Sequence, residues 1–307
     1  MGKYFTNLAI VLFCLSVLFI GPVWAKPQKV LLLQYFKAEP INLIVSEIET
    51  HFKAKHPDMT LEVMSNNDIP TLVNKVTTFA PDLILLVGAK PLDSIRANSG
   101  NTPIVVSDLV LPSKVSKVIN ENTALATLDI ALELRAQYVT KMIPTAKTIS
   151  VVYNTTENGE LIEKFSERMS RKNITVKKLI ISSEKDIVQI KSFDADVLLI
   201  IPDSITCRPM VLKYLMPLAA QQKVPMIGLS RAFAQMGTLF ALEPDYKRNA
   251  WQVCEVADRI INGEKPGEIG VVEMDHLAYF INLSIAKYLD IHITKDIIDG
   301  AEIVFGK

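Results

Sequence analysis

Cysteine, histidine and glycine are scarce in this chain of 307 residues, which holds three Cys, four His and 12 Gly. The histidines are scattered, and no group has the spacing of metal ligands, so we expect neither a metal site nor another cofactor. Cys14 lies in an apolar N-terminal segment, which leaves Cys207 and Cys254. A disulfide and two buried thiols are both compatible with that pair, and the helical pattern around Cys254 favours thiols.

Sequence motifs of enzymes are also missing. No Gly-x-x-x-x-Gly-Lys loop is present to hold a nucleotide phosphate, and no Gly-x-Gly-x-x-Gly follows the first predicted strand. The segment from Gly228 to Ala232 approaches the nucleophile elbow of hydrolases, but Ala232 stands where the elbow needs a second glycine. The chain is therefore not predicted to be an enzyme.

An excess of charge of either sign is absent, because 33 Lys and Arg residues face 33 Asp and Glu residues. Such a balance argues against a surface for nucleic acid or for an anionic membrane. We therefore expect no nucleic-acid partner.

A single long apolar run is present, from Leu8 to Ile20. Lys3 precedes this run, and residues 23–25 (Val-Trp-Ala) follow it with side chains that a signal peptidase tolerates. We expect a signal peptide over residues 1–25, cleavage after Ala25 and a soluble periplasmic protein. An uncleaved membrane anchor is the alternative, although the run is short for a span of roughly 20 residues.

Beyond residue 25, short apolar runs alternate with amphipathic stretches. Strands nearly apolar throughout are typical of parallel sheets covered on both faces. Repeated β-α-β units predict an α/β fold with two doubly wound parallel sheets, one in each of two lobes. The first series has predicted strands at 30–36, 61–64, 83–87 and 104–106 and helices at 41–56 and 70–79. A helix at 124–142 leads to the second series, with strands at 149–153, 176–181, 197–201 and 226–229 and helices at 160–171 and 210–222.

The segment 225–246 combines a buried strand, a polar loop, a short helical turn, a second strand and a helix that begins at Asp245. Its Leu-Ser-Arg-Ala-Phe, Phe-Ala-Leu and Pro-Asp-Tyr patterns, followed by Asn-Gly-Glu-Lys-Pro, resemble the periplasmic solute-binding proteins of ABC transporters. The resemblance is to those with the type I fold, in the branch that binds tryptophan and other amino acids. Residues 280–289 are similar to the closing segment of that family, with Asp290 in place of a usual glycine. The resemblance is strong from about Thr148 to Phe305 and weaker before it.

The resemblance implies two lobes between which the chain crosses three times. Mapped onto this sequence, lobe one holds 26–112 and 245–270, and lobe two holds 113–244 and 271–307. It further implies a monomer that closes around a small polar ligand and delivers it to an ABC permease in the inner membrane. An amino acid or similar zwitterion is one option for the ligand. A ligand-sensing module for a membrane receptor is one alternative, and an exported α/β hydrolase is another.

Polar residues follow the predicted strands at their carboxyl ends, where ligands bind in open α/β sheets. By themselves these residues could equally cap helices or form turns. The fourth-strand loop departs from the Asp-Pro and Gly-Val pattern of the family, so the identity of the ligand is not carried over. The predicted ligand-binding residues are Tyr35, Gly88 and Ser107 in lobe one, Asn154, Asp203 and Ser230 in lobe two, and Asp245 at a hinge crossing. Within this set, Asp203 or Asp245 would pair with a ligand ammonium group.

Overall fold

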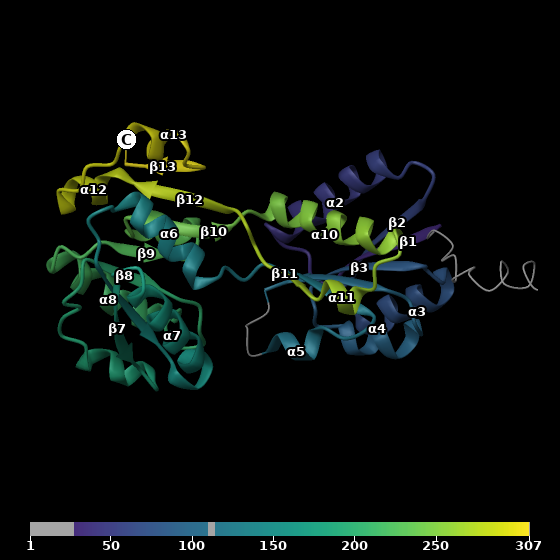
Figure 1. The fold of residues 1–307 in the computed structure, drawn as a ribbon, viewed down its shortest axis with the longest axis horizontal. Helices are drawn as coiled ribbons and strands as arrows, with labels where there is room; N and C mark the ends of the chain where they lie inside the picture. The colour runs from purple at the N-terminus through teal and green to yellow at the C-terminus, as the bar shows by residue number, and fades with distance from the viewer. Residues whose placement is uncertain (1–27, 110–113, 307) are drawn as a thin grey trace, which may run out of the picture.

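The computed structural model describes residues 28–109 and 114–306, which form two α/β lobes joined by three crossings of the chain (Figure 1). The predicted signal peptide, and residues 110–112 of the fourth-strand loop, lie outside the described residues. In the part that the structure describes, no helix is both long and apolar enough to cross a membrane.

Lobe one contains a sheet of six parallel strands in the order β11-β5-β4-β3-β1-β2. Val30 and Leu32 pack in the same core as α2 and α10, whereas Leu31 packs with α3 and α4 on the other face. Because both faces are covered, successive residues of each strand are apolar. The strands are β1 (Lys29–Gln34), β2 (Thr60–Ser65), β3 (Leu83–Val87), β4 (Ile104–Asp108), β5 (Thr123–Thr127) and β11 (Val271–Val272). The helices are α2 (Ile41–Lys55), α3 (Ile69–Phe79), α4 (Leu92–Ser99), α5 (Val115–Val118), α10 (Tyr246–Ile261) and α11 (Pro266–Ile269).

Lobe two contains a sheet of seven strands in the order β13-β12-β10-β9-β8-β6-β7. The strands from β7 to β10 are parallel, and β12 pairs antiparallel with β10. The strands are β6 (Thr148–Tyr153), β7 (Thr175–Ile180), β8 (Val197–Ile200), β9 (Met226–Gly228), β10 (Phe240–Pro244), β12 (Leu277–Asn282) and β13 (Ile303–Phe305). The helices are α6 (Leu132–Met142), α7 (Thr155–Ser170), α8 (Pro209–Gln221), α9 (Arg231–Met236), α12 (Leu283–Leu289) and α13 (Lys295–Asp299), with a 3-10 helix at Glu184–Gln189. The predicted α/β class with two lobes is confirmed.

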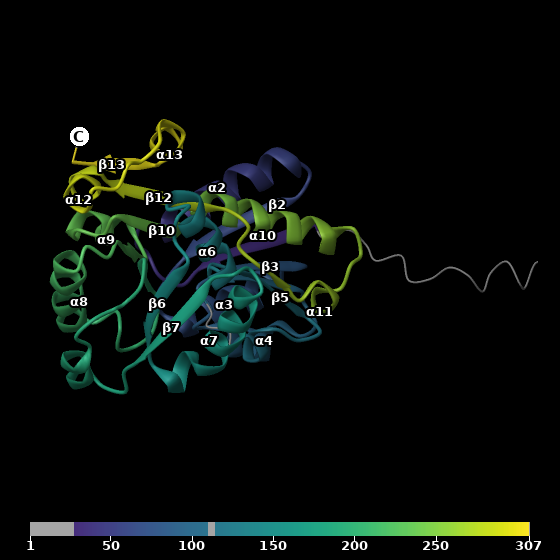
Figure 2. The same cartoon turned by 60° about the vertical axis from the view of Figure 1, so that its left-hand side comes forward.

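Three short segments connect the lobes: 128–131 between β5 and α6, Asp245 between β10 and α10, and 273–276 between β11 and β12. After the second crossing α10 runs beside α2 on lobe one, as two views agree (Figure 1 and Figure 2). The buried side chains Leu128, Ile130 and Met274 join the apolar cores of the two lobes into one cluster. The hinge is therefore packed on apolar side chains and is not a free linker.

The first crossing lies later in the chain than the sequence predicted. Residues 123–127 form β5, which pairs with β4 in the sheet of lobe one, and α6 begins only at Leu132. The predicted helix over 124–142 and the lobe boundary at residue 112 are therefore wrong. Thr123–Thr127 is a short, fully buried run containing two alanines, and such a run has no periodicity that separates a strand from a helix. Lobe one likewise extends to β11, two residues beyond the predicted end at residue 270.

Candidate ligand-binding cleft

The carboxyl ends of the strands in lobe one face those of the parallel strands β6 to β10 in lobe two. The chain leaves β5 and β11 at their carboxyl ends to enter lobe two, and it leaves β10 at its carboxyl end to return to lobe one (Figure 1). The loops after β1, β3 and β4 therefore face those after β6, β8 and β9. This is the edge at which open α/β sheets bind ligands.

On lobe two, Asp203 and Asn154 organise the backbone of adjoining loops. One Asp203 oxygen accepts the amide N–H of Asn154 at 2.9 Å, and the other accepts those of Ile205 at 2.8 Å and Thr206 at 2.6 Å. Asn154 caps α7 by accepting the amide N–H of Thr156 at 2.8 Å. Asp203 is only 9% exposed, so its carboxylate is used by the protein itself.

Ser230 begins α9 without capping it, since its hydroxyl makes no capping hydrogen bond. The first amide of that helix, on Arg231, is instead accepted by Glu243 Oε2 at 2.9 Å. Burial raises the pKa of the Glu243 carboxyl, and the Arg231 amide and charge oppose that shift. At the second crossing, Asp245 caps α10 by accepting the amide N–H of Arg248 at 2.9 Å.

On lobe one, the predicted residues are held by contacts within the lobe. Ser107 is 1% exposed, and its hydroxyl donates to Asn249 Oδ1 on α10 at 2.6 Å. Gly88 has a φ of 96°, and a Cβ added there would lie 3.3 Å from Tyr35 Cβ. Tyr35 is half-buried, and Lys90 Nζ lies 5.3 Å from its ring centroid.

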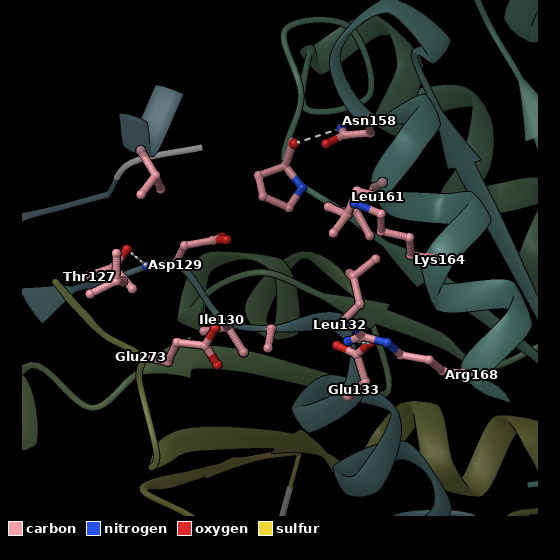
Figure 3. Close-up of a pocket in the computed structure, with 15 residues that line it drawn as sticks. Thr127, Asp129, Ile130, Leu132, Glu133, Asn158, Leu161, Lys164, Arg168 and Glu273 are labelled. Carbon is pink, nitrogen blue, oxygen red and sulfur yellow. Dashed lines mark hydrogen bonds and ion pairs between the residues drawn. The ribbon is translucent and has the colours of Figure 1, made fainter. Parts of the chain in front are cut away.

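A cavity of about 320 Å³ lies where the first and third crossings meet α6 and α7 (Figure 3). It is lined from both lobes: Thr127 and Val271 belong to lobe one, and Asn158 and Leu161 lie on α7 of lobe two. Asn158 is fixed by donating from Nδ2 to the Pro202 carbonyl at 3.2 Å. None of the seven residues predicted from the sequence lines this cavity, although Pro202 adjoins Asp203.

Two acidic side chains of the lining, Asp129 and Glu273, come from different crossings. Burial raises the pKa of Asp129 to about 6, and the negative charge of Glu273 adds to this shift. The positive charge of Arg135 and the Ile130 amide act in the opposite direction. Asp129 is absent from the predicted site residues because the sequence predicts a helix over 124–142, where the structure has β5 and the first crossing. Recognising 123–127 as a strand would have marked Asp129 as one more strand-end residue.

Arg135 on α6 is a buried cation near this acidic pair. Its side chain is 4% exposed, its Nη1 donates to the Leu242 carbonyl at 3.4 Å, and its Nε has no hydrogen-bond partner among the described residues. Burial lowers the pKa of Arg135 to about 10, and Asp129 opposes that shift. The guanidinium therefore remains charged at neutral pH and favours the ionised form of Asp129.

The remaining chemistry of the described chain is sparse. No group of three or more His, Cys, Asp or Glu side chains in residues 28–109 and 114–306 is arranged to hold a metal ion. Cys207 and Cys254 are free thiols, in lobe two and lobe one respectively. Burial raises the pKa of both, that of Cys254 to about 12, which makes these thiols poor nucleophiles at neutral pH.

Comparison with known proteins identifies the family. The family described as ABC transporter substrate-binding protein matches residues 47–304. The chain belongs to this family. The resemblance inferred from the segment 225–246 and the tail is thus confirmed.

Individual relatives of this substrate-binding protein are distant. It is 24% identical over 245 residues to a tyrosine-binding protein of Clostridioides difficile, covering 74% of this chain and 69% of the relative. Among solved structures, it resembles the ligand-free, open structure of a substrate-binding protein with adhesive properties from Clostridium difficile, with a TM-score of 0.71 and 20% identity. That match covers 91% of this chain and all of the other. An ABC domain from Streptococcus pneumonia in complex with L-Trp matches with a TM-score of 0.57 and 16% identity, over 90% and 99% of the two chains. These structural matches support the two-lobed fold.

Proposed function

We propose that this substrate-binding protein captures an amino acid between its two lobes and delivers it to an ABC permease. The observation that carries the proposal is the cavity lined from both lobes and from two hinge crossings, in a chain of this family. A ligand that contacts both lobes binds the closed arrangement better than the open one, and it shifts the equilibrium by that difference in affinity. The names of the tyrosine-binding and L-Trp-bound relatives support an aromatic amino acid.

The wall of lobe one suits an aromatic or apolar ligand side chain. Phe36 follows β1 at this wall and is 58% exposed, next to the half-buried Tyr35. An exposed aromatic ring loses unfavourable contact with water when a second ring packs on it. Ser230, whose hydroxyl caps nothing, is the predicted residue of lobe two most available for a ligand hydrogen bond.

A thermal-shift screen tests ligand binding, with the purified chain from Lys26 onward as the sample. The panel holds L-tyrosine, L-tryptophan, the other amino acids, sugars and nucleobases. At about 100 times its dissociation constant a ligand adds about 2.7 kcal/mol of stability, which raises the melting temperature by several degrees. Selective shifts with amino acids are expected. Small-angle scattering should show a smaller radius of gyration at saturation, and an unchanged radius would contradict lobe closure.

Delivery to a permease is tested in cells. We expect a strain that lacks this protein to lose high-affinity uptake of the amino acid found in the screen. Normal uptake combined with a lost transcriptional response to that amino acid would instead indicate the sensing role. Export is tested by N-terminal sequencing of the protein from the periplasm, which should begin at Lys26.

A further inference from the structure

The two carboxylates of the hinge cavity approach one space from separate segments. Asp129 lies on the first crossing and Glu273 on the third, and both side chains are directed toward the space in front of α7 (Figure 3). They are close enough for the charge of Glu273 to act on Asp129. Two like charges in a partly buried cavity repel each other, so a cation between them would be stabilised.

The other charged side chains of the lining are already paired. Glu133 on α6 forms an ion pair with Arg168 on α7 at 2.6 Å, and Lys164 pairs with Glu160 at 2.5 Å. Neither Asp129 nor Glu273 has an ion-pair partner within 4.0 Å among the residues that the structure describes. The unpaired charge of the cavity is therefore negative.

Apart from Thr127 and Asn158, the uncharged lining is apolar and is contributed by both lobes and the hinge. Ile130 lies at the first crossing, Leu132 begins α6, Leu161 lies on α7 and Ile201 follows β8. A volume of about 320 Å³ is near the lower end of the range for small-molecule sites and far exceeds the space a single ion needs. The cavity thus suits an organic cation with an apolar body better than a bare metal ion.

Arg135 is a buried cation that acts on the Asp129 carboxylate from outside the cavity. Its guanidinium is buried, and its Nε has no partner among the residues that the structure describes. It acts on Asp129 through its charge, yet it forms no ion pair with Asp129 within 4.0 Å. Arg135 is also outside the cavity lining. It therefore favours the ionised carboxylate without occupying the space in front of it.

We propose that the hinge cavity receives the ammonium group of the ligand, held between Asp129 and Glu273. Because these carboxylates belong to two different crossings, one ammonium group would tie both segments together. This inference rests on the proposed function, and it replaces Asp203 and Asp245 as the expected partners of the ammonium group. Both of those carboxylates already accept backbone amides.

Calorimetric titration of the purified protein with three probes tests the proposal. The probes are L-tyrosine, tyramine, which lacks the carboxylate, and 3-(4-hydroxyphenyl)propanoate, which lacks the ammonium group. We expect L-tyrosine and tyramine to bind and the propanoate to bind at least about tenfold more weakly. Asp129→Asn and Glu273→Gln should each weaken L-tyrosine binding by about tenfold or more, which corresponds to about 1.4 kcal/mol.

Glu49→Gln is the matched control, because Glu49 on α2 lies outside the cavity and forms an ion pair with Lys53 at 2.6 Å. It should change the affinity less than about twofold, as expected for a solvent-exposed pair. If Asp129→Asn does not fold, Glu273→Gln carries the test, since Glu273 is exposed. Equal binding of L-tyrosine and the propanoate, or unchanged affinity in both variants, would overturn this inference and leave solute binding intact. Absence of binding by every amino acid in the screen and by tyramine would overturn both proposals.

The pH dependence provides a second readout. Binding of an ammonium group requires ionised Asp129, so affinity for L-tyrosine should fall as the pH drops below about 6. The charged groups that act on Asp129 are Arg135 on α6 and Glu273 on the third crossing, and Glu133 on α6 and Lys164 and Arg168 on α7 line the same cavity. Glu273→Gln removes a charge that raises the pKa of Asp129. In this variant the loss of affinity for L-tyrosine should therefore occur at lower pH. An unchanged midpoint would argue against a shared site.

Discussion

The strand-end loops and the hinge crossings both bring carboxylates to the space between the lobes, and the two regions use them differently. Asp203 and Asp245 accept amide N–H groups at the start of a loop or helix. Asp129 and Glu273 have no ion pair among the described residues and line a cavity. The first amides of a helix lack partners within that helix, so a strand that turns into a helix needs nearby acceptors. A polar residue at a strand end is therefore often structural, and an unpaired charge is the better sign of a binding site.

The largest effect should come from Asp203→Ala. The substitution leaves three amides without their acceptor in a position that is 9% exposed, and it should lower the free energy of unfolding by about 3 kcal/mol. Urea denaturation without ligand measures this loss, with Asp203→Asn, which keeps one acceptor oxygen, as the milder control. If Asp203→Ala had normal stability but lost affinity for the ligand, Asp203 would be a ligand-binding residue and not a structural one.

Ser107→Ala should be less costly. It removes the hydroxyl that donates to Asn249 Oδ1 and leaves that buried oxygen without a donor, at a cost of about 1–2 kcal/mol. Ser46 on α2 is an exposed serine whose hydroxyl donates to the Leu43 carbonyl, and Ser46→Ala should stay within about 0.5 kcal/mol of the wild type. Equal losses in these two variants would show that the contact between β4 and α10 contributes little.

Gly88→Ala should cost about 1 kcal/mol. Its φ of 96° is strained for a residue with a side chain, and the new Cβ would lie 3.3 Å from Tyr35 Cβ. Gly100 also has a positive φ, of 58°, but a Cβ there meets nothing within 4 Å. The difference in melting temperature between Gly88→Ala and Gly100→Ala therefore reports the crowding at Tyr35. If Tyr35 lines the ligand wall, only Gly88→Ala should also reduce ligand affinity.

A change in stability of the opposite sign is expected for Asp129→Asn. The folded protein raises the pKa of Asp129 from 3.8 to about 6, so it binds this proton more tightly than the unfolded chain does. The stability that this group contributes is complete below about pH 4 and is lost as the pH rises through about 6. Asp129→Asn should therefore be more stable than the wild type at pH 7 and show no such advantage below pH 4. Thermal melts at both pH values measure this, and a less stable variant at pH 7 would mean that Asp129 is structural.

Much of lobe two could be predicted from the sequence because its signals are local. The strands at 149–153 and 197–201 differ from β6 and β8 by one residue at one end. Asp245 was expected to start a helix, and it caps α10. An apolar run, a turn residue and a capping side chain each act within a few residues, so they can be read without knowledge of the rest of the chain.

The amino-acid sequence by itself determined the alternation of strands and helices, the two-lobed class and the family. Tertiary structure decided that Thr123–Thr127 is a strand, because pairing with β4 and β11 outweighs the weak preferences of a five-residue run. It also decided that β12 runs antiparallel to β10, and that Asp203 faces backbone amides. Asp129 and Glu273 are separated by most of lobe two in the sequence, and only the return of the chain through the hinge places them on one cavity. Charges brought together in this way have no local pattern, because their proximity depends on how both sheets are ordered.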